Sequence, residues 1–302
     1  MKPEIIVIVG PTASGKTSLS IKLAKQKNGE IISADSMQIY KYMDIGTAKV
    51  TKDEMQGIPH YMIDIVSPNE RFSVSDYVKQ ATECIEKILA KGKTPIVVGG
   101  TGLYIDSLIY GIKFSELKID EEYREKLNKI AAEEGLENLY NMAVEIDPEA
   151  MKIISKNDRK RIIRILEIYK QTGKTKTQQN VESRLESVPY TYKVYGIDMK
   201  RDLLYERINK RVDIMLENGL IEEVKDILGK YNEFPTAMQG LGYKEVVEYL
   251  NGITTMEEMI EKLKKETRRY AKRQLTWFRK NKEITWIDPN EGDKTHEISG
   301  IL

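Results

Sequence analysis

The sequence has 302 residues, a formal net charge of +1, and an ordinary balance of 40% hydrophobic and 31% charged residues. Its single cysteine excludes a disulfide within the chain, and only two histidines argue against a His-based metal site or a Ser-His-Asp triad. No apolar run approaches the ~20 residues of a membrane helix, and the first residues lead directly into a predicted strand. We therefore expect a cytoplasmic protein without signal peptide or membrane segment, with one large domain or one domain carrying an insertion.

The first predicted elements are a buried strand over residues 4–9 and a helix that begins near Ser18. Between them lies GPTASGKT, which fits the phosphate-loop pattern of a glycine, four free positions and then Gly-Lys-Thr. Here glycines let the backbone wrap around an anion, lysine contacts terminal phosphates, and the threonine hydroxyl ligates Mg²⁺. The residues expected to bind a di- or triphosphate are Gly10, Pro11, Thr12, Ala13, Ser14, Gly15, Lys16 and Thr17, with Thr17 as the metal ligand.

A second strand is predicted over residues 30–34, and it brings Asp35 to its carboxyl end. Parallel α/β sheets bind ligands at the carboxyl ends of their strands, so Asp35 is expected to face the same crevice as the phosphate loop. The alternative is that its carboxylate caps the following turn. Residues 39–49 have little periodicity and indicate a loop, residues 60–66 alternate as in a strand, and residues 73–91 have helical spacing.

The next buried strand, over residues 94–98, ends in Gly99-Gly100-Thr101. Many phosphate-loop ATPases and kinases place here an aspartate that holds Mg²⁺. The glycines indicate instead a close backbone approach, and Thr101 offers one hydroxyl group. A helix N-cap is the alternative role for Thr101, and the two roles are compatible.

The alternation of strands and helices is interrupted after residue 113. Helical spacing covers residues 120–134, 136–145, 147–155 and 158–172. Consecutive helices between strands indicate an inserted domain. We predict an α/β fold, a P-loop NTPase-like parallel sheet flanked by helices, with a catalytic core over residues 1–113 and 195–302 and an inserted all-helical domain over residues 114–194.

After the insertion, a strand is predicted near residues 192–197. The further predicted elements are helices over 201–217, 220–231, 241–250 and 254–278, and a last strand over 284–287. Basic side chains concentrate in residues 152–176 and 259–282. In a nearly neutral chain, such segments are typical of proteins that bind nucleic-acid phosphates. The alternative is a solvated helix face.

Six sequence blocks, taken together, carry a resemblance that spans nearly the whole chain. They are GPTASGKT at 10–17, SADSMQIY at 33–40, MDIGTAK at 43–49, VGGTGLY at 98–104, AMQGLGYK at 237–244 and TRRYAKRQLTWFR at 267–279. In this order they resemble the bacterial tRNA dimethylallyltransferases, also called tRNA isopentenyltransferases. The resemblance implies a prenyltransferase that moves a dimethylallyl group from dimethylallyl diphosphate to the exocyclic amine of the adenosine 3′ of the anticodon, releasing diphosphate.

The resemblance also implies a role for individual residues. Asp35 would take the proton from the amine, Thr101 would help to place that site, and Lys16 and Arg211 would hold the diphosphate together with Mg²⁺. Without the resemblance, Arg211 would be interpreted as a surface charge. The residues implied to face tRNA are Asp35, Ser36, Met37, Gln38, Thr101, Arg124, Lys160, Arg161, Ile162, Ile163, Arg164, Gln239, Gly240, Leu241, Gly242, Tyr243 and Lys244. A monomer is expected, with the helical insertion clamping the anticodon stem-loop.

Three other enzyme classes share some of these features. A small-molecule kinase with a helical lid and a nucleic-acid-binding ATPase would both account for the phosphate loop and the basic helices. Neither requires Gly-Gly-Thr at a strand end, or Asp35 beside Ser36 and Gln38. The adenylate isopentenyltransferases use free AMP or ATP, and the large insertion and long basic helix favour tRNA over that acceptor.

Overall fold

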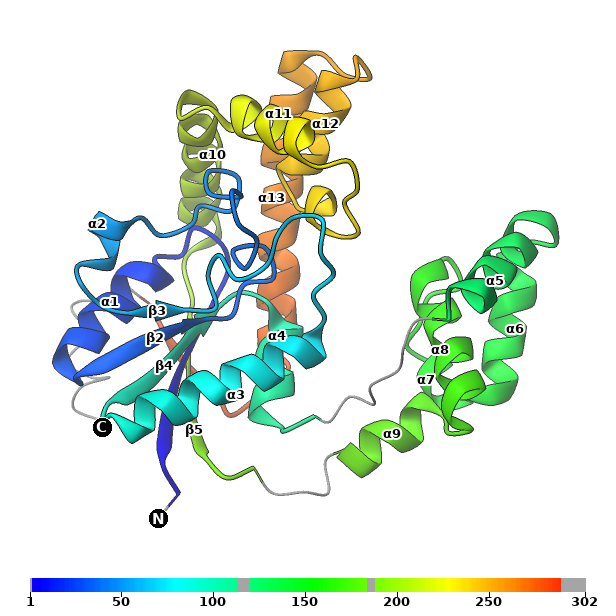
Figure 1. Cartoon of the computed structure of the whole chain (residues 1–302), viewed down its shortest axis with the longest axis horizontal. Helices are drawn as coiled ribbons and strands as arrows, with labels where there is room; N and C mark the ends of the chain where they lie inside the picture. The colour runs from blue at the N-terminus through cyan, green and yellow to red at the C-terminus, as the bar shows by residue number, and fades with distance from the viewer. Residues whose placement is uncertain (1, 113–119, 184–187, 289–302) are drawn as a thin grey trace. The chain divides into compact units, whose positions relative to one another are not determined.

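The computed structural model describes residues 2–112, 120–183 and 188–288. The chain forms two compact units (Figure 1), of which the first contains residues 1–108 and 189–302 and the second contains residues 109–188. We call them the sheet unit and the helical unit.

The sheet unit is built on six parallel strands in the order β3-β2-β4-β1-β5-β6. The strands are β1 (Glu4–Val9), β2 (Gly29–Ser33), β3 (His60–Tyr61), β4 (Thr94–Gly99), β5 (Thr191–Ile197) and β6 (Thr285–Ile287). β1 is central, and its Ile8 lies opposite Val98 of β4 and Tyr195 of β5. The nearly continuous apolar sequence of β1 and β4 suits strands that are covered on both faces. The predicted parallel α/β sheet is confirmed.

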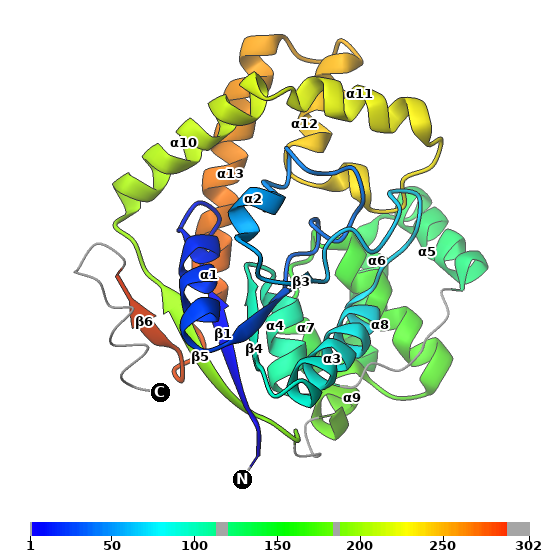
Figure 2. The same ribbon diagram turned by 60° about the vertical axis from the view of Figure 1, so that its left-hand side comes forward.

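Helices α1 (Lys16–Gln26) and α3 (Val74–Ala90) pack on the sheet. The other helices of the sheet unit are α2 (Lys52–Met55), α4 (Gly102–Ile109), α10 (Arg201–Glu217), α11 (Leu220–Lys230), the short 3-10 helix η1 (Ala237–Gln239), α12 (Tyr243–Leu250) and α13 (Met256–Phe278). Of these, α11, η1, α12 and the first half of α13 share a separate apolar cluster with residues of the loop after β2. Ile21 and Leu23 of α1 pack on Ile6 and Ile8 of β1. The chain moves outward from β1 to β2 but back inward from β3 to β4, so right-handed crossovers put α1 and α3 on opposite faces (Figure 2).

The boundaries of the long helices follow from local chemistry. Ser73 and Asp76 form a capping box at the start of α3, and Thr255 and Glu258 form another at the start of α13. These two predicted helices are confirmed.

The helical unit contains five helices in its described residues. They are α5 (Glu121–Glu133), α6 (Leu136–Ile146), α7 (Pro148–Met151), α8 (Arg159–Thr172) and α9 (Lys176–Ser183). Leu127, Leu139 and Leu166 are buried in their common core. The helices predicted over 120–134, 136–145 and 158–172 are confirmed, whereas the helix predicted over 147–155 is helical only over 148–151. Helix α9 was not predicted, because its sequence KTQQNVES offers only one strongly apolar position.

The predicted strand over residues 60–66 is confirmed only at its first two residues. Met62 and Asp64 have φ values of 62° and 56°, which interrupt an extended ladder. The chain returns to the sheet direction only at Val66, which forms an isolated bridge with Tyr40. Among the described residues, no helix combines the length and apolar character needed to cross a membrane.

Candidate functional site

The phosphate loop connects β1 to α1 in the sheet unit. A Cβ atom added to Gly10 would lie 3.2 Å from the Cβ of Ile197 on the neighbouring strand, so the loop needs glycine at its start. Gly15 has a φ of 90° and lies at the N-cap of α1, where it turns the backbone into the helix. The loop therefore directs backbone N–H groups and the positive end of α1 toward the same region.

Lys16 lies in this loop and is held by it. Its ammonium group donates a hydrogen bond of 2.6 Å to the carbonyl oxygen of Pro11. Burial and, to a lesser extent, the nearby Arg211 lower the pKa of Lys16 to about 7, although the charge of Asp35 opposes this shift. A bound anion would place a negative charge beside this buried ammonium group and favour its charged form.

Arg211 comes from α10, far from the loop in sequence, and reaches it in the fold. Its Nη1 donates to Oγ1 of Thr12 over 3.1 Å. Burial lowers the pKa of Arg211, while the charges of Glu54 and Asp35 act in the opposite direction. The hydroxyl oxygen of Ser14 is buried without a hydrogen-bond partner among the described residues. Two cations and an unsatisfied hydroxyl thus gather at a loop of anion-binding shape.

Asp35 follows β2 and is partly exposed. Its Oδ1 accepts hydrogen bonds from the backbone N–H of Met37 at 2.8 Å and of Gln38 at 3.3 Å. One oxygen therefore caps the turn, as the alternative interpretation from the sequence proposed. Asp35 also influences the pKa of both Lys16 and Arg211, so its carboxylate lies close to the anion-binding loop. The cap and a chemical role are compatible because a carboxylate has two oxygens.

The turn after β4 joins Thr101 to the Asp35 segment. A Cβ on Gly99 would approach the carbonyl oxygen of Ala34 to 2.1 Å, which only glycine avoids. The N–H of Thr101 donates to that same carbonyl over 3.2 Å, and the N–H of Ser36 donates to Thr101 Oγ1 over 3.0 Å. The close backbone approach predicted for this turn is confirmed, and Thr101 directly precedes α4.

Two site residues on α13 were missed by the sequence analysis. Gln274 is buried, and its Oε1 accepts from the N–H of Thr12 while its Nε2 donates to the carbonyl of Gly100, each over 2.9 Å. Tyr270, one turn earlier, hydrogen-bonds to Thr101 and Gln274, and burial followed by the charge of Asp35 raises its pKa. The signal available in the sequence was a glutamine on the buried stripe of a helix.

The helical unit brings two of its predicted tRNA-facing residues, Arg124 and Arg164, to one carboxylate. Arg124 makes a bidentate ion pair with the buried Glu167, over 2.6 and 2.9 Å, and Arg164 reaches the same carboxylate at 3.3 Å. Arg161 pairs with Asp158 over 3.0 Å.

The isoleucines of this segment have a packing role. Ile162 and Ile163 are 0% and 6% exposed in the core of the unit, so their side chains do not face solvent. The prediction of RNA contacts in this segment therefore rests on Lys160, Arg161 and Arg164. It remains a prediction.

The segment 239–244 connects η1 to α12. Gly240 packs against Met37, where an added Cβ would lie 2.4 Å from the methionine Cε. Tyr243 is fully buried, and its hydroxyl donates to Glu223 over 2.6 Å. The side chain of Lys244 is 61% exposed. The segment therefore adjoins the turn after Asp35 through Gly240. The Tyr243 side chain is buried beneath the segment and does not face solvent.

A family model described as IPP transferase matches residues 38–281. The chain belongs to the IPP transferase family. A tRNA dimethylallyltransferase from Caldanaerobacter subterraneus subsp. tengcongensis is 55% identical over 290 residues, covering 95% of this chain and 92% of that protein. The crystal structure of a tRNA isopentenylpyrophosphate transferase from Bacillus halodurans matches with a TM-score of 0.73 and 44% identity, covering 100% of this chain and 94% of that one. A eukaryotic dimethylallyltransferase acting on tRNA matches with a TM-score of 0.82 and 31% identity, covering 99% of this chain and 77% of that one.

The IPP transferase match begins at Gln38 and therefore leaves out the phosphate loop and Asp35. The structural similarity to the Bacillus halodurans transferase extends over the whole chain and includes both. Membership of this family confirms the prenyltransferase class that the sequence blocks predicted. The roles of single residues stay predictions.

Proposed function

We propose that this chain is a tRNA dimethylallyltransferase. It transfers a dimethylallyl group from dimethylallyl diphosphate to the exocyclic amine of the adenosine 3′ of the anticodon and releases diphosphate. The observation that carries the proposal is the meeting of a phosphate loop with Asp35 and Thr101 at one sheet edge, in a member of the IPP transferase family. A tRNA acceptor favours the cytoplasm as the compartment.

The phosphate loop, Lys16 and Arg211 would bind the diphosphate group. Lys16 exchanges its bond to the Pro11 carbonyl for a phosphate oxygen, and the buried Ser14 hydroxyl gains an acceptor. These groups stabilise the negative charge that grows on the diphosphate as the allylic C–O bond breaks. Because the stabilisation is greatest in the transition state, it accelerates the reaction as well as binding the substrate.

Magnesium would be held at the start of α1. Thr17 is exposed there and offers a hydroxyl oxygen. No group of three or more His, Cys, Asp or Glu side chains in the described ranges could hold a metal ion. A single hydroxyl oxygen from Thr17 fits Mg²⁺, which usually keeps several waters and is held largely by substrate phosphates. When bound, the ion neutralises charge on the diphosphate.

Asp35 would receive the proton of the attacking amine. Its Oδ1 is committed to the turn, and Oδ2 accepts no hydrogen bond from the described residues. The amine nitrogen forms a bond to the allylic carbon, the carbon–oxygen bond breaks with its electrons going to diphosphate, and the amine proton passes to Oδ2. Thr101, fixed by Ser36 and Tyr270, orients the amine.

The tRNA would be held by both units. The target adenosine is stacked in the anticodon loop and must be turned out, which costs a few kcal/mol. Basic side chains of the helical unit, with Arg124, Lys160, Arg161 and Arg164 as candidates, offset this cost through the loop phosphates. Segments 35–38 and 239–244 would face the extruded nucleotide, and we propose that the enzyme acts as a monomer.

The experiment is transfer of radiolabel from dimethylallyl diphosphate into tRNA that lacks the modification. We expect label in acid-precipitable tRNA without added ATP, and none when AMP replaces tRNA. Transfer to AMP at a comparable rate would support an adenylate isopentenyltransferase instead. A requirement for ATP would support a kinase or ATPase.

A further inference from the structure

We infer that Glu223 is a positioning residue for the adenosine side of the site. Its carboxylate ties the loop 43–49 to α12, and through them it keeps segments 35–38 and 240–243 side by side. The inference rests on the proposed function, because it gives those two segments the nucleotide as their ligand. Nothing in the transfer chemistry requires Glu223 itself to touch the substrate.

The carboxylate of Glu223 has four neutral donors. Oε2 accepts from the backbone N–H of Asp44 at 2.9 Å and of Ile45 at 2.7 Å. Oε1 accepts from the N–H of Gly46 at 3.1 Å and from the hydroxyl of Tyr243 at 2.6 Å. Three consecutive N–H groups that converge on one carboxylate form an anion-binding concavity, called a nest. The Glu223 carboxylate therefore fixes the conformation of the loop 43–49.

The loop transmits this order to the turn after Asp35. The side-chain amide of Gln38 donates to the carbonyl oxygens of Thr47 at 3.2 Å and Ala48 at 3.3 Å, directly beyond the nest. The backbone N–H of Gln38 is bonded to Asp35. A displaced loop would therefore move Gln38, and with it the carboxylate that receives the proton.

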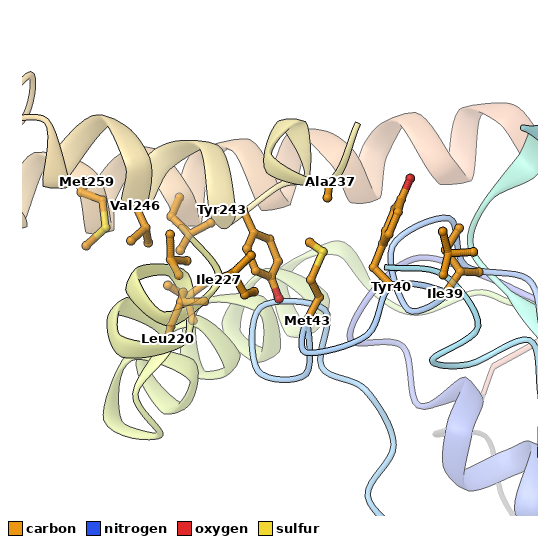
Figure 3. Close-up of a cluster of buried hydrophobic side chains, with 13 residues drawn as sticks. Ile39, Tyr40, Met43, Leu220, Ile227, Ala237, Tyr243, Val246 and Met259 are labelled. Carbon is orange, nitrogen blue, oxygen red and sulfur yellow. The ribbon is translucent and has the colours of Figure 1, made fainter. Parts of the chain in front are cut away.

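The second connection runs through Tyr243. Its ring packs over Gly46, where an added Cβ would lie 2.6 Å from the ring carbon Cε2, so this position needs glycine. Burial, followed by the charge of Glu223, raises the pKa of Tyr243, which stays a hydroxyl donor. Figure 3 shows Tyr243 and Met43 as neighbouring members of one apolar cluster.

The connection through Gln38 and the connection through Tyr243 meet again at the turn after Asp35. Gly240, three residues before Tyr243, packs against Met37 of the turn after Asp35. The path from Asp35 through Gln38, the loop, Glu223 and Tyr243 therefore returns to its starting segment. Glu223 is the one charged side chain on this path that accepts from both the loop and α12. Its removal would leave three backbone N–H groups without their acceptor.

The test compares Glu223→Gln with Glu222→Gln, the neighbouring and exposed carboxylate in the same helical turn. The glutamine amide replaces one acceptor oxygen by a donor that faces other donors. We expect the KM for an anticodon stem-loop to rise about tenfold to a hundredfold in Glu223→Gln, with the Kd for dimethylallyl diphosphate within twofold of wild type by calorimetry. Glu222→Gln should match wild type in both.

A second variant, Tyr243→Phe, removes one of the four donors and keeps the ring, so it decides the matter if Glu223→Gln does not fold. Its KM for the stem-loop should rise about threefold to tenfold at an unchanged Kd for dimethylallyl diphosphate. Equal kinetics in Glu223→Gln and Glu222→Gln, an unchanged KM in Tyr243→Phe, or a parallel loss of both substrates overturns the positioning role while leaving the proposed function intact. A wild-type protein that transfers no label overturns both.

Discussion

Replacing Asp35 by asparagine separates its two expected duties. In the native turn, Oδ1 accepts from the N–H groups of Met37 and Gln38. Asparagine retains an oxygen that can accept both bonds, so the turn and the binding of both substrates should persist. The second oxygen becomes an amide nitrogen, which cannot take a proton from the amine. The substitution therefore removes proton acceptance and little else.

The expected magnitude follows from that loss. A positioned general base contributes about 10²–10⁴-fold to a rate, which is about 3–5 kcal/mol of activation free energy. We expect the single-turnover rate of Asp35→Asn to fall by this factor, with enzyme in excess over labelled tRNA. Gel-shift affinity for tRNA and the Kd for dimethylallyl diphosphate should stay within about threefold of wild type, because the contacts that bind them are retained.

Two further variants make the result interpretable. Asp53→Asn changes an exposed carboxylate of α2 and should leave the rate unchanged. Asp35→Ala also removes the Oδ1 cap and should weaken tRNA binding as well as the rate. A near-normal single-turnover rate in Asp35→Asn would refute the role of general base and leave Asp35 as a turn cap.

Four other predictions concern the loop, the basic helix and the core. Lys16→Ala should lower turnover by about 10²–10³-fold and leave gel-shift affinity for tRNA unchanged; equal loss of tRNA binding contradicts it. Because the pKa of Lys16 is about 7, kcat/KM for dimethylallyl diphosphate should fall up to about tenfold per pH unit above that value, and Lys16→Arg should flatten this limb; a profile identical in both contradicts it. Replacing Lys160, Arg161 and Arg164 by alanine should flatten the plot of log affinity for tRNA against log salt by about one unit per lost contact; an unchanged slope indicates a solvated face. Burial would raise the pKa of Glu30, but hydrogen bonds from Lys93, Tyr61 and Lys91 lower it to about 2. Its stabilisation is therefore present above about pH 4.5 and lost as the pH falls toward 2, and Glu30→Gln should destabilise the fold by about 2 kcal/mol at pH 7, with a flatter acid limb of thermal unfolding.

The fold was predictable where the pattern is local. The apolar runs of β1 and β4 and the spacing of α3 and α13 are contained in short windows of sequence, and the structure confirms them. The end of β3 was not predictable from alternation, because residues 62 and 64 adopt positive φ although neither is glycine. The strand order also lies outside a local pattern, since it depends on which neighbours each strand finds.

The candidate site shows the same division. The glycine spacing of the phosphate loop identifies it without any tertiary information. Arg211 was expected only through a family resemblance, because nothing near it in sequence shows that α10 reaches Thr12. Gln274 and Glu223 were missed altogether. Helical periodicity tells which face of a helix is buried, but not which distant backbone groups a buried polar side chain will meet.

The measurement that tests the central claim most directly is mass spectrometry of nucleosides and anticodon-loop fragments from tRNA incubated with this protein and dimethylallyl diphosphate. The account predicts a mass increase of one dimethylallyl unit on the adenosine immediately 3′ of the anticodon, with diphosphate released in equal amount. Unmodified tRNA, or a dimethylallyl group found only on free AMP or ATP, would contradict it.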